Sequence, residues 1–273
     1  MRGGLAWRHL AWYAWSACAL ASEPPFKVCM LSHNLPYSAQ ASASGFDVET
    51  ARAAAQALGR ELALVWVANP TSIQEIDDSD FPLLRLAHGG CDAIFSVPGP
   101  ARDTLKGQSS LTLGAPYYGA AFELFGTPIT PGNLRALRDQ SVAIQAQTVA
   151  SFALALLHAK QRTFFAPLPA LQSVVKGDAA AALLWGPSAG WQLKQHAELK
   201  LAIASGYAPP PALSWNLQVA TRTTDTALRA AIDAALQKLA QDGRLAQLAA
   251  TYGIPFHPPF AATYSLTEIN KLQ

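Results

Sequence analysis

One short string of this 273-residue sequence has the spacing of a nucleophilic catalyst. Gly186, Ser188 and Gly190 match the GxSxG pattern, in which a serine stands on a sharp turn between a strand and a helix. An enzyme of that type also needs an acid-bearing strand and then a histidine after the serine. The residues between Ser188 and His257 instead predict a proline-rich segment and two helices. We therefore expect no catalytic residues, and serine hydrolysis stays only as a third alternative.

Metal, cofactor and nucleic-acid sites lack the residue patterns that they need. Histidine stands at positions 9, 33, 88, 158, 196 and 257, without HxxxH or Cys-His ligand spacing, and no GxxxxGK phosphate loop occurs. Lys and Arg total 20 against 18 Asp and Glu, so the formal net charge of +2 gives no strong field for binding phosphates. With 14% charged and 51% hydrophobic residues, the chain is not a disordered acidic or basic protein. We expect no metal, no cofactor and no nucleic-acid partner.

Residues suited to binding a small molecule follow the predicted strands. Ligands of open α/β sheets lie at the carboxyl ends of the strands, which is where these residues stand. Arg102 can hold a carboxylate bidentately, and Thr148 at a helix start offers a hydroxyl and free N–H groups to an anion. The alternatives are a plain cap for Thr148, a solvated charge for Arg102 and core aromatics for the larger rings. The candidate ligand-binding residues are Asn34, Tyr37, Ser96, Arg102, Thr148, Trp185 and Gly186.

The elements that must position these residues alternate between strand and helix. Apolar runs predict strands at 26–31 and 62–67, and between them apolar residues at helical spacing predict a helix over 47–58, followed by Gly59. This order indicates a βαβ unit in a parallel sheet. A third strand is predicted at 91–97.

The pattern then restarts after a cluster of Gly and Pro between residues 126 and 132. We predict a second α/β unit with strands at 141–145 and 179–185, and helices that start after Thr148 and at Gly186. The chain then returns to the first unit through a strand at 217–221 and two closing helices. The expected division is 26–122 plus 217–262 as lobe I and 127–212 as lobe II, with crossings near 122–127 and 211–217.

The first 21 residues have the layout of a secretory signal peptide. Arg2 and Arg8 precede an apolar run from Leu10 to Leu20, and residues 19–21 (ALA) supply a small-x-small cleavage site. The run is about half the ~20 residues that a spanning helix needs. We predict cleavage after Ala21 and an exported protein that does not span the membrane. A membrane anchor and a lipoprotein acylated at Cys18 are the alternatives.

Export explains the odd number of cysteines. Three Cys occur in the whole chain, and removal of Cys18 leaves Cys29 and Cys91 as one potential pair in an oxidising compartment. A bridge between them would join two neighbouring strands of one sheet. The alternative is two buried thiols that act as small hydrophobic side chains.

Six segments of the chain carry a family resemblance. They are FKVCMLSHNLPYS at 26–38, GFDVETARAAAQALG at 45–59, GGCDAIFSV at 89–97, APYYGAAFELFG at 115–126, SVAIQAQT at 141–148 and the helical ending at 227–255. Together they resemble the family 3 bacterial solute-binding proteins, the periplasmic receptors of ABC importers. This resemblance implies an α/β fold of the periplasmic-binding-protein type II class, with two lobes, two crossing strands and a cleft between the lobes.

Within that family the chain looks most like a branch associated with PQQ-dependent quinoprotein dehydrogenases, including methanol dehydrogenase systems. The residues that suggest this are the Val28-Cys29 pair with 34–38 (NLPYS), Cys91-Asp92 before Val97-Pro98, and Gly177-Asp178 before 185–190 (WGPSAG). The resemblance implies a non-catalytic periplasmic protein that assists a quinoprotein alcohol dehydrogenase. An ABC-importer receptor for a small solute, anions included, is the first alternative, with a permease as partner. An enzyme, either the hydrolase or a dehydratase on this fold, is the last.

Two departures from the amino-acid receptors of the family affect the expected ligand. Those receptors have a Thr-containing stretch before the carboxylate-binding Arg, whereas residues 96–101 here are SVPGPA. They also place an acidic residue for the ligand ammonium after the second-lobe strand, where this chain has Trp185-Gly186-Pro187. An ammonium group buried there without a partner is costly. The resemblance therefore argues against standard α-amino acids as ligands.

Overall fold

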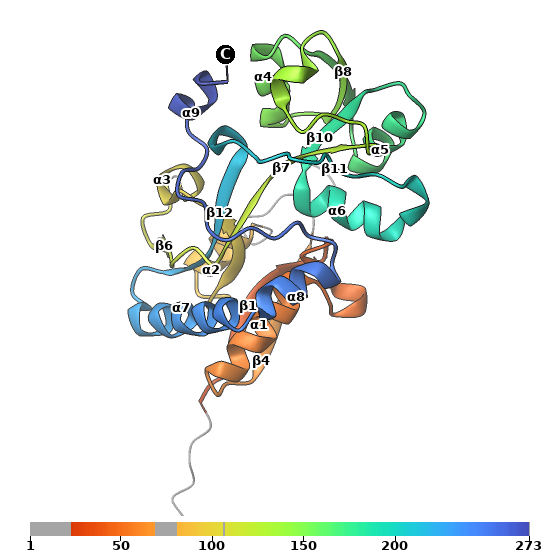
Figure 1. The fold of residues 1–273 in the computed structure, drawn as a ribbon. Helices are drawn as coiled ribbons and strands as arrows, with labels where there is room; N and C mark the ends of the chain where they lie inside the picture. Colours follow the sequence, from red (N-terminus) through yellow and green to blue (C-terminus); the bar gives the residue numbers. More distant parts are fainter. Residues whose placement is uncertain (1–22, 69–80, 106, 273) are drawn as a thin grey trace, which may run out of the picture.

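The computed structural model describes residues 23–68, 81–105 and 107–272, and the predicted signal peptide lies outside these residues. Figure 1 shows two groups of elements, with strands β7 (Tyr118–Gly126) and β12 (Ser214–Arg222) running between them. We call the lower group in that view lobe I and the upper group lobe II. Strands β7 and β12 therefore connect the two lobes.

Lobe I is built on parallel strands. Strand β1 (Phe26–Leu31) pairs in parallel with β4 (Leu62–Val67), and the bridge from Val28 to Ala93 continues the sheet to the segment before β5 (Ile94–Pro98). The expected parallel βαβ unit is therefore present. The other elements of this lobe are β2 (His33–Asn34), β3 (Ser38–Ala39), η1 (Gln40–Ser42), α1 (Phe46–Ala57), α2 (Pro82–Ala87), α3 (Ala101–Thr104), β6 (Leu111–Leu113), α7 (Thr226–Gln241) and α8 (Arg244–Thr251).

Helix α1 begins where the chain needs a glycine. Gly45 has φ +137°, a backbone conformation that L side chains rarely adopt, and a Cβ there would lie 2.2 Å from the carbonyl oxygen of Tyr37. The close approach lets the amide of Asp47 donate to that same oxygen over 2.9 Å. Glycine at this position therefore brings the first turn of α1, with Asp47, against the loop that carries Tyr37.

Lobe II contains a second parallel group. Strand β8 (Ser141–Gln145) lies between β10 (Ala181–Trp185) and β9 (Lys160–Phe164), and both pair with it in parallel. Apolar residues fill β8 and β10, as the sequence predicts, whereas β9 is polar, largely exposed and absent from the prediction. The other elements are η4 (Leu134–Leu137), α4 (Val149–Leu156), α5 (Pro167–Val175), α6 (Gly186–Gln195), η5 (Ala197–Leu199), β11 (Ala202–Ile203) and η6 (Pro211–Leu213).

Strand β7 belongs to both lobes. Its first half, from Tyr118 to Ala121, pairs with β12, and its second half, from Phe122 to Phe125, pairs with β10. All nine residues are buried. The sheet order β5-β12-β7-β10-β8-β9 therefore connects the two lobes, and the first of the two crossings, β7, is one continuous strand. The predicted boundary at the Gly and Pro cluster marks the end of this strand.

The apolar cores follow the same division. One cluster joins β1, α1, β5 and the inner faces of α7 and α8, with Phe26, Phe46 and Ile232 completely buried. Clusters on β8 and β10 form the core of lobe II, with Ile144 and Leu183 completely buried. Each lobe thus buries its own apolar residues, as a unit that folds around its own core does.

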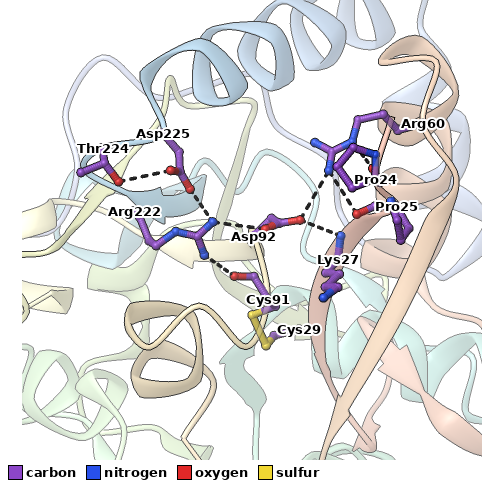
Figure 2. A network of polar contacts seen from close by, with 10 residues as sticks. All are labelled: Pro24, Pro25, Lys27, Cys29, Arg60, Cys91, Asp92, Arg222, Thr224 and Asp225. Carbon is purple, nitrogen blue, oxygen red and sulfur yellow. Dashed lines mark hydrogen bonds and ion pairs between the residues drawn. A yellow bond between two sulfur atoms is a disulfide. The ribbon is translucent and has the colours of Figure 1, made fainter. Parts of the chain in front are cut away.

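Cys29 and Cys91 form a disulfide. Their Cα atoms lie 5.7 Å apart, and 62 residues separate them in sequence. Figure 2 shows Asp92 beside the bridge, where its carboxylate receives the amide of Lys27 at 3.0 Å and Arg222 at 3.2 Å. The bridge and this polar network join β1, the start of β5 and the end of β12.

The C-terminal segment extends from lobe I to lobe II. After α8, His257 pairs with Gly119 of β7, and Asn216 of β12 exchanges two hydrogen bonds with the backbone of Phe260. Helix α9 (Leu266–Asn270) follows, and Leu272 packs against the core of lobe II. In Figure 1 this dark blue segment rises from α8 to α9 beside both crossing strands. Neither α9 nor this path is expected from the sequence.

No helix within the described ranges is long and apolar enough to cross a membrane. The described residues also hold no cluster of three or more His, Cys, Asp or Glu with the arrangement of a metal site.

Candidate functional site

A cavity of about 600 Å³ lies between the lobes. Lobe I supplies the ends of β1 and β5 and the loop after β1, lobe II supplies Thr148 and Trp185, and the crossing strands supply Phe122, Trp215 and Leu217. This volume falls in the range of pockets that bury a small organic molecule, about 300–1,000 Å³. The carboxyl ends of β1, β5, β8 and β10 meet at this cavity, as expected for an open α/β sheet.

Aromatic side chains form the floor of the cavity. Phe122 and Trp185 meet edge to face with ring centroids 5.6 Å apart, and Trp185 meets Trp215 in the same way at 5.7 Å. Trp215 in turn stacks on Tyr264 of the C-terminal segment at 5.1 Å. The rings come from β7, β10, β12 and the C-terminal segment, so the floor of the cavity is also the place where the lobes join.

A buried polar cluster stands at the lobe I side of the cavity. The Ser96 hydroxyl donates to the Asp47 carboxylate over 2.5 Å, and the Ser96 amide donates to the hydroxyl of Tyr117 over 3.0 Å. The Tyr118 hydroxyl lies 3.2 Å from the same Ser96 oxygen. Ser96 has φ +52°, a strained conformation for a residue with a side chain, and such strain concentrates at functional sites. The cluster therefore holds Asp47 in one position at the cavity wall.

Burial controls the protonation of this cluster. Removal from water raises the pKa of Asp47 from 3.8 to about 7, and the hydrogen bond from Ser96 opposes part of that rise. Burial also raises the pKa of the Tyr37, Tyr117 and Tyr118 hydroxyls, and the nearby Asp47 charge adds to each rise. Among the described residues that line the cavity, Asp47 is therefore the group that changes charge near neutral pH.

One hydrogen bond joins the two lobes across the cleft. The indole N–H of Trp185, from lobe II, donates to the hydroxyl of Tyr37, from lobe I, over 3.1 Å. Tyr37 follows β1, and Trp185 is the last residue of β10. We call this hydrogen bond the cleft latch. Both side chains line the cavity, so the latch is part of its wall.

Five of the seven predicted binding residues line this one cavity: Asn34, Tyr37, Ser96, Thr148 and Trp185. Thr148 stands at the N-cap position of α4, but its hydroxyl donates to the carbonyl of Gln145 over 2.8 Å instead of capping the helix. Thr148 is thus the residue at the helix start, as predicted, and its hydroxyl does not make the capping hydrogen bond of the alternative interpretation. The hydroxyl oxygen can still accept a hydrogen bond from a ligand.

Gly186, one of the other two predicted residues, is not among the residues that line the cavity. Gly186 begins α6 and packs behind the wall, where a Cβ would lie 2.8 Å from the Cγ of Glu123. This close contact accounts for a glycine there. The backbone of Arg102 lies in α3, and its side chain lies outside what the structure describes.

The serine of the GxSxG string lies in helix α6. Among the described residues, no His or carboxylate makes a hydrogen bond with Ser188. His257, the histidine that follows it in sequence, bonds through Nε2 to Glu123 over 2.7 Å. Within the part of the chain that the structure describes, Ser188 thus has no hydrogen bond to the base that a serine nucleophile requires.

Several residues that line the cavity are not predicted from the sequence. Asp47 stands in the first turn of a helix, where an acidic residue is explained by the helix dipole alone, and nothing local shows its burial. Phe122 and Trp215 belong to the strands that cross between the lobes, so only the topology brings them together. A usable signal is the acidic residue directly after Gly45-Phe46, because a carboxyl flanked by apolar residues on a buried face needs a partner.

Known structures share this fold. The unliganded open L-cystine solute receptor of Neisseria gonorrhoeae superposes with a TM-score of 0.67 at 16% identity, over 84% of this chain and 92% of that one. MxaJ from Methlophaga aminisulfidivorans MPT gives 0.61 at 22% identity over 85% and 99%. The ancestral cationic amino acid solute-binding protein AncCDT-1 gives 0.65 at 22% identity over 84% and 95%. The expected fold class, periplasmic-binding-protein type II, is confirmed.

No protein-family model matches the chain, and no curated protein matches it. At these identities the structural likeness shows the fold alone.

Proposed function

We propose that this protein is an exported, non-catalytic solute-binding protein that holds one small organic molecule between its lobes. The observation that carries the proposal is the cavity of about 600 Å³, to which both lobes contribute side chains. Two of the proteins with this fold are described as an L-cystine solute receptor and a substrate-binding protein of an amino acid ABC transporter. The signal-peptide layout of residues 1–21 supports export to the periplasm.

Binding works through the relative position of the lobes. Lobe I (26–122 plus 217–262) and lobe II (127–212) meet at the crossing strands, and the cleft latch joins them across the cavity. A solute that contacts both walls stabilises the closed arrangement, and a partner that recognises this arrangement then senses occupancy.

A library of small metabolites tests the proposal, with a rise in the unfolding temperature as the first readout and calorimetry on each hit. We expect at least one solute to bind with a Kd below about 100 µM, and Trp185→Ala to weaken that binding at least tenfold. Arg102→Ala shows whether the predicted arginine takes part. A failure of every solute to bind would overturn the proposal.

Two partners are proposed for the occupied protein. A PQQ-dependent quinoprotein dehydrogenase is the first, supported by the strings at 28–38, 91–98 and 177–190 and by the shared fold of MxaJ. An ABC permease is the second, supported by the receptors of the same fold. The immobilised full chain, offered purified methanol dehydrogenase and a permease complex in parallel, distinguishes them. Capture of the dehydrogenase by wild type supports the accessory role, and capture of the permease alone supports import.

Enzymatic alternatives have a direct test. A fluorophosphonate probe is expected to leave Ser188 unlabelled, because no described base lies within hydrogen-bond distance of it. A dehydratase activity is the other alternative, because one structure of this fold is described as a precursor of cyclohexadienyl dehydratase. Turnover by the purified chain that Asp47→Asn abolishes would contradict the non-catalytic role.

A further inference from the structure

The chemistry of the cavity wall restricts the solute, and this step rests on the binding function proposed above. Most of the lining is apolar or aromatic, including Met30, Leu83, Phe95, Phe122, Trp185 and Trp215. A ligand that fills this space therefore has a predominantly apolar body.

Most polar groups of the lining already have partners inside the protein. The hydroxyls of Ser38 and Thr148 donate to backbone carbonyls over 2.7 and 2.8 Å, and the Thr104 hydroxyl donates to the carbonyl of Pro98. Ser96 donates to Asp47, and Tyr37 accepts from Trp185. The wall thus directs few hydrogen-bond donors at a ligand.

The carboxyl of Asp47 differs from the other polar groups of the described lining, because it is ionisable and lacks a counter-ion. Within the described residues, no Lys, Arg or His makes an ion pair with it, and the described lining of the cavity contains no Lys or Arg. The groups that surround it are the hydroxyls of Ser96, Tyr37, Tyr117 and Tyr118. Its relative exposure is 7%. A buried carboxylate in this position is incompletely compensated.

The charge of a ligand determines whether its interaction with this cavity wall is favourable. An anion would bring a second negative charge to Asp47 among apolar side chains, which is costly. A cation would supply the missing counter-charge, and the faces of the aromatic rings attract cations as well. We propose that the cavity takes an organic cation: a protonated amine on an aromatic or branched aliphatic body, without a carboxylate of its own.

The proposal predicts a coupled proton. Burial raises the pKa of Asp47 to about 7, so below that pH most of the empty protein carries a neutral carboxyl. A bound ammonium group stabilises the ionised form, so binding releases a proton at pH 6 and releases almost none at pH 8.5. Amine affinity therefore rises between pH 5.5 and pH 8, while the affinity for an uncharged ligand does not.

Matched ligands of one body and different head groups test the proposal on the full chain by calorimetry. The first series is phenethylamine, 2-phenylethanol, 3-phenylpropionate and phenylalanine, and the second series replaces the phenyl ring by an isobutyl group. We expect the amine of a series to bind at least tenfold more tightly than its alcohol at pH 8, and the carboxylate and the zwitterion to bind more weakly than the alcohol.

Two variants separate the carboxyl from a general structural effect. Asp47→Asn is expected to lower amine affinity at least tenfold and to change alcohol affinity less than threefold, which also reports that the cavity still forms. Asp178→Asn makes the same chemical change at an exposed position of lobe II and is expected to change neither.

The outcomes distinguish this inference from the function on which it rests. Tighter binding of an alcohol, a carboxylate or an amino acid than of the matching amine would overturn the cationic ligand and leave a solute-binding protein. No binding by either series, with a hit from the wider solute library, would overturn the ligand class in the same way. No binding by any solute would overturn both.

Discussion

At the scale of single residues, Asp47 links stability to pH. Its pKa rises from 3.8 to about 7 on burial. Between these two pH values the folded protein therefore holds a proton that the unfolded chain has released. An acid with a raised folded pKa favours folding while it is protonated, and the advantage is lost as pH rises from about 4 through 7. The three-unit rise corresponds to about 4 kcal/mol, at 1.36 kcal/mol per unit.

Asp47→Asn removes this titration. We expect the free energy of unfolding of the variant to change less than that of the wild type between pH 4.5 and 8, and the variant to be the more stable protein at pH 8. Urea unfolding of both proteins across this range measures the difference, with Asp178→Asn as the matched exposed change. Parallel pH curves for wild type and Asp47→Asn would contradict the burial of the carboxyl.

A second buried carboxyl belongs to Glu123 of β7. Glu123 is 1% exposed, and its Oε1 lies 2.7 Å from Nε2 of His257. Since a buried carboxylate left without its partner is costly, we expect His257→Ala to destabilise the protein by about 3 kcal/mol. Glu123→Gln added to that variant should recover part of the loss.

Urea unfolding of the wild type, the two single variants and the double variant gives the coupling energy between the side chains of Glu123 and His257. His196 and Glu198 form a pair of the same residue types 3.0 Å apart on the surface, with the Glu side chain 69% exposed. The same cycle on this exposed pair is expected to show no measurable coupling. Equal coupling energies in the two cycles would mean that the buried pair of Glu123 and His257 stabilises the protein no more than the exposed pair does.

At the scale of elements, local composition explains which strands and helices the sequence predicts. Short segments dominated by apolar residues place β1, β4 and β8 with the correct ends, because the strands of a covered parallel sheet are largely apolar on both faces. Strand β9 (KQRTF) is not predicted, because it is an exposed edge strand and its residues have no apolar pattern.

The crossing strands are harder to predict for a different reason. The predicted strand at 217–221 is really β12, Ser214–Arg222, which extends toward lobe II because it pairs with β7. Likewise, the predicted strand at 91–97 starts too early, and β5 begins at Ile94. Pairing partners that lie 100 residues away decide these ends, and no local pattern contains that information.

The disulfide between Cys29 and Cys91 stabilises the folded sheet of lobe I against unfolding. Closing the 62-residue segment between Cys29 and Cys91 restricts the unfolded chain, and this restriction is worth about 4 kcal/mol in the chain-entropy model. We expect the double variant Cys29→Ala, Cys91→Ala to lose roughly that amount in the free energy of unfolding.

Chemical reduction of the wild type provides the control for this variant. Reduced wild type and the double variant should unfold at similar urea concentrations, since the restriction is absent from both. A double variant as stable as the oxidised wild type would show that the bridge does not constrain the unfolded chain.

At the scale of the whole molecule, the C-terminal segment couples the two lobes. Tyr264 stacks on Trp215 at the floor of the cavity, and Leu272 packs against lobe II. Removal of residues 263–273 takes away both contacts. We expect the truncated chain to stay folded, to lose about 2 kcal/mol of stability and to show altered tryptophan fluorescence.

A surface variant serves as the comparison for the truncation. Leu266→Ser changes an exposed residue of α9, 74% accessible, and should leave both the stability and the fluorescence as in the wild type. An unchanged fluorescence spectrum in the truncated protein would contradict the stacking of Tyr264 on Trp215.

The position of β12 in the sheet has a consequence for the order in which the chain can fold. This strand lies between β5 and β7, yet it is the last strand in the sequence. The lobe I sheet must therefore remain open until the final quarter of the polypeptide has arrived, whereas the parallel strands of lobe II are contiguous in sequence. Loop closure over more than 100 residues is slow compared with local pairing. A chain that is made from its N-terminus thus completes lobe II before lobe I, and the cavity between them is the last feature to form.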